Sequence, residues 1–333
     1  MTYREDFFRM LDGKTPIADV PLNKMTFDPA APPQGVASIM TLERGGFGPV
    51  PGSDKDAWGV PQQIDDFGTG YMPASGQHIL KDVTKWRDII HAPYDYDYDW
   101  AAGAEHDLAV QKFDPETQIS SMFGAGGAYF LQMAGFMGFE GAMLAMYDEP
   151  EAVHELLNYL CEYDLWVVEH ILKYYPMIDV MGIGDDNATE INPFISYDMF
   201  KEFLLPYYKR VADLLKENGK IVSYHNCGRC EDFMDDMVDI GVQVWNCATP
   251  VNDLMAFKAK YDNKIILEFA PRFYIGSTHE EIKQQVHDLI DTYAPGGAFV
   301  WVGGAATMNP EIGAQLEGWI YDEVEAYGKG FYA

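Results

Sequence analysis

The sequence is poor in basic residues. Only 23 of its 333 residues are Lys or Arg, against 52 Asp and Glu, which gives a formal net charge of −29 at pH 7. Proteins bind phosphate backbones through clustered Lys and Arg, so this balance argues against nucleic acid as a partner. The charge fits a soluble protein that repels its own copies, or one that docks a basic surface.

Long apolar runs and cysteines are also scarce. No run of about 18 apolar residues occurs, so no membrane span is expected. The first sixteen residues are charged and helix-like and lack the apolar core of a signal peptide. The four cysteines are too few to staple a chain of this length. We therefore expect reduced thiols and a cytoplasmic location.

Two regions of the chain differ in pattern. Residues 1–115 are rich in Pro, Gly, Asp and aromatic residues and have weak periodicity. Within them, residues 45–73 are typical of a long loop with a hairpin, and a loop of this length is unusual unless it is functional. From about residue 117, apolar β-rich runs alternate with amphipathic helix patterns. The expected strands are 118–123, 178–183, 221–225, 242–247, 265–270 and 298–303.

Three helical segments are the clearest: 149–175, 196–219 with a break before Pro206, and 278–297 with a capping box at its start. Apolar strands that alternate with helices predict a parallel sheet. Two further strands fit near 16–22 and 35–42. We therefore expect one α/β domain over residues 1–333, a single (β/α)8 TIM barrel. It has an irregular, loop-rich N-terminal part (1–115) and a regular core (116–333). An open doubly wound sheet is the alternative.

In such a barrel, functional groups lie at the carboxyl ends of the strands. Several polar residues stand at these ends: Asp185, Asp186, Asn187, His225, Cys227, Cys247 and Arg272. Glu268 lies inside an apolar strand, where a carboxylate is costly unless it is paired or bound to metal. These residues predict a polar site at the mouth of the barrel.

His225 and Cys227 are two residues apart at the end of a strand, so both side chains can face one pocket. An imidazole and a thiolate make half of a zinc site. Cys227 and Cys230 also form the CxxC spacing of a thioredoxin-type site, although the chain is much too long for that fold. Asp185 and Asp186 are a candidate general-base or ligand pair, or they cap the following helix. For Cys247, core packing and pocket lining remain open.

Several motifs resemble one known family. They are DEPEAVHELL, IGDDN, ISYDMFKEFLLPYYKRVADLLKENG, SYHNCG and a closing VGGA, in this order over about residues 130–330. Together they resemble the uroporphyrinogen decarboxylase superfamily, whose members are single (β/α)8 barrels. The Met-Arg-Gln-Ala-Gly-Arg segment of the heme-pathway decarboxylase is missing, since the corresponding region holds KMTFDPAAPP and MTLERGG.

The resemblance to the corrinoid-dependent methyltransferase branch, found in anaerobes, is better. Its thiol-methylating members bind zinc through a His-x-Cys pair and a distant Cys on the last strand. His225 and Cys227 match the pair, but residues 302–304 read Val-Gly-Gly. The resemblance therefore implies a zinc site of His225, Cys227 and Glu268, with an Asp of 185–186 as another substitute ligand.

This branch implies the first methyltransferase of an O-demethylase system. Such an enzyme moves methyl from a small aromatic methyl ether to cobalt(I) of a separate corrinoid protein, which supplies the cobalamin. The catalytic residues implied are Asp185, Asp186, Glu268 and His225. The composition of the Gly- and aromatic-rich loop 45–73 predicts an arene pocket lined by Phe47, Trp58, Tyr71 and Met72. Asn187 and Arg272, after two of the strands, are further candidate substrate-binding residues.

Other interpretations stay open at this point. The methyl donor could be a methylamine or a methylthiol. A metal-free lyase related to uroporphyrinogen decarboxylase would use Asp185 or Asp186 as its acid. A non-catalytic protein would bind corrinoid or tetrapyrrole without turnover. A homodimer is compatible with all of these.

Overall fold

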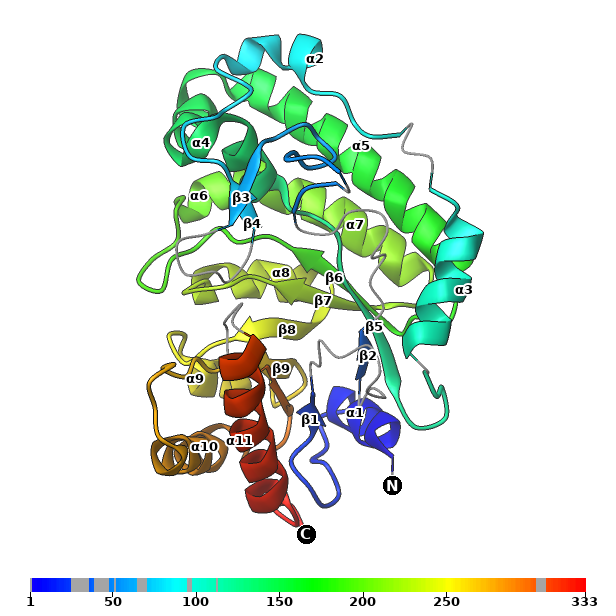
Figure 1. Cartoon of the computed structure of the whole chain (residues 1–333), viewed down its shortest axis with the longest axis vertical. Coiled ribbons are helices and arrows are strands. Elements are labelled where there is room, and N and C mark those ends of the chain that lie inside the picture. Colours follow the sequence, from blue (N-terminus) through cyan, green and yellow to red (C-terminus); the bar gives the residue numbers. More distant parts are fainter. Residues whose placement is uncertain are drawn as a thin grey trace.

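A parallel eight-stranded sheet forms the centre of the computed structural model (Figure 1). The structure describes residues 2–24, 36–38, 48–50, 52–64, 71–94, 98–111, 113–303 and 310–333. The strand order is β1-β10-β9-β8-β7-β6-β5-β2. The strands are β1 (Leu22–Asn23), β2 (Val36–Ser38), β5 (Ile119–Gly126), β6 (Val180–Gly184), β7 (Ile221–His225), β8 (Val242–Ala248), β9 (Ile266–Phe269) and β10 (Phe299–Val302).

The predicted α/β class and the parallel sheet are confirmed. Each of the six expected apolar runs forms a strand, β2 lies within the expected 35–42, and β1 begins at the end of the expected 16–22. Neighbouring strands from β1 through to β2 pair in parallel, as in a TIM-barrel-like fold. Among the described residues β1 is not paired with β2, so closure of the full eight-stranded barrel stays a prediction.

Helices follow most of the strands and cover the outside of the sheet (Figure 1). The α-helices of the described residues are α1 (Tyr3–Leu11), α2 (Trp86–Ile89), α3 (Trp100–Gln111), α4 (Tyr129–Asp148), α5 (Pro150–Tyr174), α6 (Tyr197–Met199), α7 (Leu205–Glu217), α8 (Met234–Ile240), α9 (Leu254–Lys260), α10 (His279–Tyr293) and α11 (Pro310–Gly328). Among the described residues, no helix combines the length and apolarity needed to cross a bilayer.

The helix starts and stops follow local sequence signals. Thr278 and Glu281 form the expected capping box at the start of α10. The break expected before Pro206 is a π-helical turn (Phe200–Leu204) between α6 and α7. Proline has no N–H and its ring clashes with the carbonyl four residues earlier, so a regular α-helical ladder cannot run through it.

Helix α1 closes the amino-terminal end of the sheet. Its buried Phe7 and Met10 pack on side chains that point to the inside of the sheet, among them Ile221 of β7 and Ile266 of β9. Inward and outward side chains alternate along each strand. Ile221 therefore lies at this closed end, and His225, four residues later, points inward at the opposite end.

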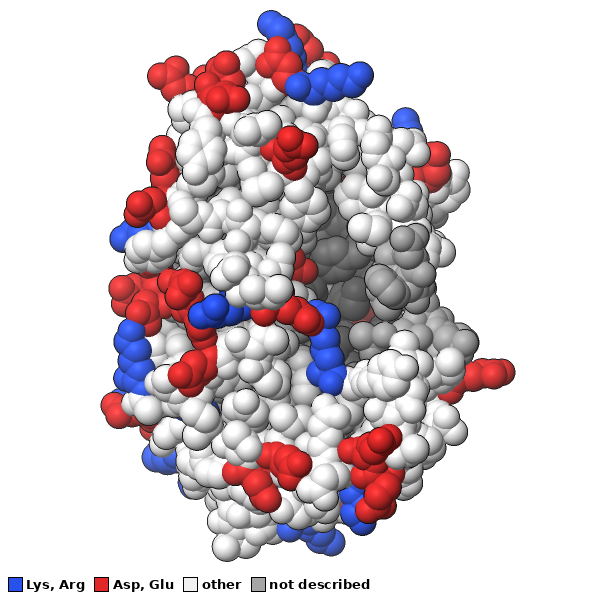
Figure 2. Space-filling view, turned by 90° about the vertical axis from the view of Figure 1, so that its left-hand side faces the viewer, with Lys and Arg blue, Asp and Glu red and all other residues white. Residues whose placement is uncertain are grey.

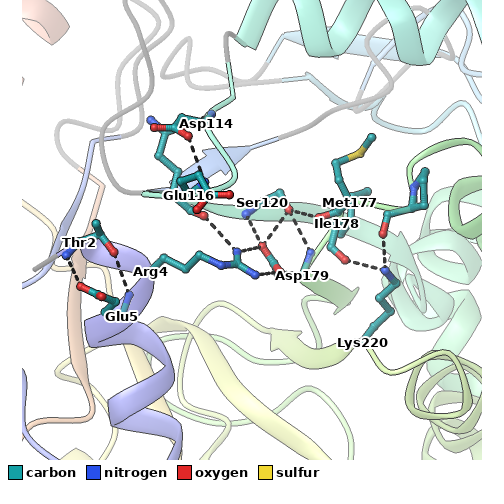
Figure 3. A network of polar contacts seen from close by, with 12 residues as sticks. Thr2, Arg4, Glu5, Asp114, Glu116, Ser120, Met177, Ile178, Asp179 and Lys220 are labelled. Atoms are coloured by element: carbon teal, nitrogen blue, oxygen red, sulfur yellow. Dashed lines mark hydrogen bonds and ion pairs between the residues drawn. The ribbon is translucent and has the colours of Figure 1, made fainter.

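An ion pair fixes α1 to the starts of the strands (Figure 3). The guanidinium of Arg4 donates to both oxygens of Asp179, at 2.6 and 2.8 Å. Asp179 also accepts from the backbone N–H of Ser120, at 3.0 Å. Two-point pairing of this kind adds geometric specificity as well as energy, so α1 is held in one orientation below β5 and β6.

The N-terminal region contains the expected hairpin. Strands β3 (Gln62–Ile64) and β4 (Tyr71–Pro73) pair antiparallel, away from the central sheet. Before them, the carboxylate of Asp56 accepts from the N–H groups of Trp58 and Val60, both at 2.9 Å, which shapes a tight turn.

Candidate metal centre

Three polar side chains lie in one layer across neighbouring strands. His225 of β7 is in register with Asn246 of β8, and Asn246 is in register with Glu268 of β9. Residues in register on parallel strands point to the same face, so all three side chains face the inside of the sheet. The layer stands at the carboxyl ends of the strands, where a barrel enzyme has its site.

Asn246 connects the other two residues of this layer. Its Oδ1 is hydrogen-bonded to Nδ1 of His225, and its Nδ2 donates to Oε2 of Glu268. Glu268 is only 8% exposed. Burial raises the pKa of its carboxyl, and the Asn246 hydrogen bond and the charge of His225 partly offset the rise. The costly buried carboxylate noted in the sequence therefore has an amide partner.

One group of potential metal ligands occurs beside this layer. Nε2 or Nδ1 of His225 and the Sγ atoms of Cys227 and Cys247 all lie within 4.8 Å of one another. The distance from Nε2 of His225 to Sγ of Cys227 is 3.6 Å. Glu268 is not a member of this group and reaches His225 through Asn246, so its predicted role as a ligand stays a prediction.

Cys247 joins the group because of a β-bulge. Asn246 pairs with Glu268 and Ala248 pairs with Phe269, which leaves Cys247 as an extra residue in β8. Its φ angle is 54°, in the left-handed region. Strict alternation would turn Cys247 away from Asn246, and the bulge instead brings its thiol to the ligand group. A strained non-glycine residue at such a place is typical of functional sites.

The two thiols have opposite pKa shifts. The hydrogen bond with Cys247 and the nearby His225 lower the pKa of Cys227 to about 6, against the effect of burial. The same thiol–thiol hydrogen bond, together with burial, raises the pKa of Cys247. Cys227 is therefore the first of the pair to become a thiolate, which is the form that binds metal.

His225 itself carries a raised pKa. Burial lowers it, but the hydrogen bond to Cys227 and the charges of Cys227 and Asp186 outweigh that effect. Oδ1 of Asp186 lies 3.6 Å from Nε2 of His225 and accepts from the backbone N–H of Cys227, at 2.6 Å. Asp186 thus orients the loop that carries Cys227, and its half-buried carboxylate stands at the edge of the ligand group.

The three ligands fit zinc. A tetrahedral zinc with bonds of about 2.1 Å to nitrogen and 2.3 Å to sulfur holds these two atoms roughly 3.6 Å apart. The His225–Cys227 distance has this value before any metal is considered. One imidazole and two thiols are also a known catalytic zinc set that leaves a fourth position for a substrate.

Asp185, predicted as a catalytic group, is built into the fold. It is 1% exposed, and its carboxylate accepts from Phe130 N, Leu131 N and the hydroxyl of Tyr208, at 2.8, 3.0 and 2.6 Å. The two N–H groups belong to the first turn of α4, so Asp185 caps a helix far from it in sequence. A catalytic role for Asp185 stays a prediction.

The remaining predicted residues lie in several places. Asn187 is fully buried, and its amide contacts Asn226 and the hydroxyls of Tyr208 and Tyr224. Arg272 is paired with Glu190 at 2.8 Å. Arg272 and Glu190 line a cavity of about 320 Å³ whose wall also includes Gly228 and Thr249, close in sequence to Cys227 and Cys247.

The predicted aromatic pocket is described in part. Trp58 packs edge-on against Phe136 and Tyr163 in the core, while Tyr71 and Met72 are exposed on β4. Phe47 lies outside the described residues. A substrate-binding role for these residues stays a prediction.

Cys230, the second cysteine of the CxxC spacing, is not part of the ligand group. It is fully buried, its thiol donates to the carbonyl of Asn226 at 3.8 Å, and burial raises its pKa. The thiol of Cys227 forms its hydrogen bond with Cys247, so the ligand group does not use the CxxC spacing.

Acidic side chains are spread over the face of the molecule drawn in Figure 2, and this face is hollowed near its middle. Lys and Arg are fewer there, in line with the net charge of −29. Sequence reasoning missed Asn246, and it placed Cys247 at a strand end but left open whether that residue lines the pocket or packs in the core. A polar pair at the end of the apolar run VQVW was the signal for them.

Comparisons with known proteins place the fold and the family. The solved structure of a methyltransferase from Methanosarcina mazei matches with a TM-score of 0.66 and 15% identity over 100% of both chains. A match to a 3-keto-L-gulonate-6-phosphate decarboxylase from Vibrio cholerae covers 68% of this chain and 81% of that protein, at 9% identity and a TM-score of 0.30. No curated protein matches the sequence significantly. The model of the uroporphyrinogen decarboxylase (URO-D) family matches residues 66–308, and the chain therefore belongs to this family.

Proposed function

We propose that this chain is a zinc-dependent methyltransferase. It takes a methyl group from a small aromatic methyl ether and passes it to cobalt(I) of a separate corrinoid protein. One observation carries the proposal: an imidazole and two thiols converge at the carboxyl ends of β7 and β8, with ligand atoms within 4.8 Å of one another.

Family and fold support this choice. The chain belongs to the uroporphyrinogen decarboxylase family and shares its fold with a methyltransferase of 15% identity. The arginine-containing segment by which the resemblance defines the decarboxylase is missing from the sequence. A polyacidic porphyrinogen also suits a chain of net charge −29 poorly.

Different residues bind the metal and contact the substrate in such a transfer. His225, Cys227 and Cys247 hold the metal, and zinc bound there supplies Lewis-acid chemistry toward the oxygen of the departing phenolate. Asp186 stands beside His225 and can accept a hydrogen bond from a phenolic hydroxyl of the aromatic substrate. Cobalt(I) is the nucleophile, so the chain has to provide none and instead orients donor and acceptor.

The composition of the ligand set also supports a second donor. Two thiols make the site softer than the His-Cys-Glu set expected from the sequence. Soft sulfur-rich sites suit sulfur ligands. A methylthiol or thioether donor is therefore the second candidate, with the same cobalt acceptor.

One experiment tests the metal and the reaction together. Zinc per chain is measured in wild type and in His225→Ala, and both proteins are mixed with free cob(I)alamin and either a methoxyphenol or dimethyl sulfide. We expect about one zinc in wild type, none in the variant, and methylcob(III)alamin from one donor in wild type only. Wild type that binds no zinc, or that methylates cobalamin from neither donor, would overturn the proposal.

A further inference from the structure

The two hydrogen bonds that connect Glu268, Asn246 and His225 allow only one arrangement of donors and acceptors. A carboxylate only accepts, whereas an amide both donates and accepts. Glu268 therefore requires the NH2 group of Asn246 to face it, as observed. The amide oxygen must then face Nδ1 of His225, which is also observed.

This orientation decides which nitrogen of His225 carries the proton. An amide oxygen only accepts, so Nδ1 has to be the protonated nitrogen of a neutral imidazole. Nε2 then presents its lone pair toward Sγ of Cys227, 3.6 Å away. A metal-binding imidazole needs this tautomer, and it is commonly fixed by the group bound to the other nitrogen.

Glu268 is placed to impose this direction. Among the described residues, Asn246 is the hydrogen-bond partner of its carboxylate. On the other side the register partner is Val300 of β10, which offers no side-chain donor. A carboxylate that is 8% exposed and has one neutral partner is costly for folding. A structural amide contact alone would need no charge here.

We propose that Glu268 and Asn246 are positioning residues that fix the tautomer of His225 for metal binding. The inference rests on the proposed function only in naming the metal, because the tautomer exists in the metal-free protein as well. It differs from the sequence-based expectation, in which Glu268 itself binds zinc.

Exchange of the amide and the carboxylate between positions 246 and 268 tests this proposal. In Asn246→Asp, two carboxylates meet, and while both are ionised neither can donate to the other. In the double variant Asn246→Asp/Glu268→Gln, the carboxylate accepts from Nδ1 of His225 and the new amide donates to it. The double variant thereby restores the order of donors and acceptors from residue 268 to His225, and also the formal charge of the three side chains. Asn246→Leu removes both hydrogen bonds of this side chain with little change in its volume.

Zinc affinity is measured by competition with a chromophoric chelator. We expect Asn246→Leu and Asn246→Asp to bind zinc about 10- to 100-fold more weakly, as for other lost second partners of metal-binding histidines. The double variant should return to within about threefold of wild type. If it binds zinc no better than Asn246→Asp, the inference is wrong. A direct Glu268 ligand is also distinguishable, because the double variant would then lose zinc.

A second readout needs no metal. Histidine-selective 15N NMR of the metal-free protein, at a pH where His225 is neutral, reports the protonated ring nitrogen; His225→Gln identifies the signal. We expect the Nδ1–H form in wild type and in the double variant, and a mixture in Asn246→Leu. An Nε2–H form in wild type would overturn the inference, whether or not the protein binds zinc.

Discussion

The thiol of Cys247 is hydrogen-bonded to Cys227, although the two residues belong to the ends of different strands. The contact exists because a bulge in β8 turns Cys247 to the inside of the sheet.

Cys247 should be as important for zinc as Cys227. Replacement of either thiol by alanine leaves two ligands, too few for a tight zinc site, so both variants should lose zinc during purification. Metal content by mass spectrometry measures this. Cys161→Ala is the control, because Cys161 is also a free cysteine but is buried within α5 and is not part of the ligand group, and it should keep zinc. Retention of zinc by Cys247→Ala would contradict the assignment.

The left-handed backbone at Cys247 should be measurable as strain. Glycine adopts this conformation at no steric cost, whereas alanine does not. In metal-free protein, Cys247→Gly should therefore be more stable to urea than Cys247→Ala, by about 1 kcal/mol. In an ordinary strand the order is the reverse, since glycine costs roughly 0.5–1 kcal/mol relative to alanine. The ordinary order at this position would show that the bulge is relaxed.

Gly228, next to Cys227, should not tolerate a side chain. Its φ angle is 85°, and a Cβ atom would lie 2.5 Å from the carbonyl oxygen of Thr189 and 2.8 Å from that of Ala188. Gly228→Ala should lower the free energy of unfolding by more than about 2 kcal/mol and weaken zinc binding.

Gly219→Ala is the control for this change. Gly219 has a similar φ of 69° but no atom within 4 Å of the added Cβ. The free energy of unfolding of Gly219→Ala should fall only by the cost of the left-handed backbone, about 1 kcal/mol, and its zinc affinity should not change. Equal effects of the two substitutions in urea unfolding would mean that the contact with the 188–189 backbone is not rigid.

Asp185 should make the protein less stable as the pH rises. Burial raises its pKa to about 7, although hydrogen bonds from Tyr208, Phe130 and Leu131 oppose the shift. The unfolded value is about 3.9, so the folded state binds more protons between these limits. Stability that is fully present below pH 4 is then lost up to about pH 7, at about 1.4 kcal/mol per unit.

Comparison of variants isolates this group from the other carboxylates. The difference in unfolding free energy between wild type and Asp185→Asn should fall as the pH rises from 4 to 7, by up to about 4 kcal/mol. Asp12→Asn replaces an exposed carboxylate, and the difference in unfolding free energy between it and wild type should stay constant over this pH range. A parallel curve for Asp185→Asn would show that the carboxylate is ionised throughout this range.

Much of the fold was predictable because its signals are local. Apolar runs such as Ile221–His225 and the Thr278 capping box act over a few residues. His225 and Cys227 were predictable for the same reason, since they are neighbours on one strand end. Alternation along a strand also places Asn246 on the inside, once the register of β8 is known.

The rest depends on contacts between distant segments. The bulge that turns Cys247 inward follows from the pairing of β8 with β9, which a single strand does not encode. Asp185 was recognised as a possible cap, but for the helix after its own strand. It caps α4 instead, because β6 lies beside β5 in the sheet.

The pairing of β1 with β10 has a consequence for synthesis of the chain. Leu22 is in register with Trp301, and the N–H of Val20 donates to the carbonyl of Gly328, at 2.9 Å. During synthesis on a ribosome, β1 therefore cannot pair with β10 until some 280 residues more have been added. Until then the apolar face of α1 also lacks Val300, so Phe7 and Met10 are not yet fully covered.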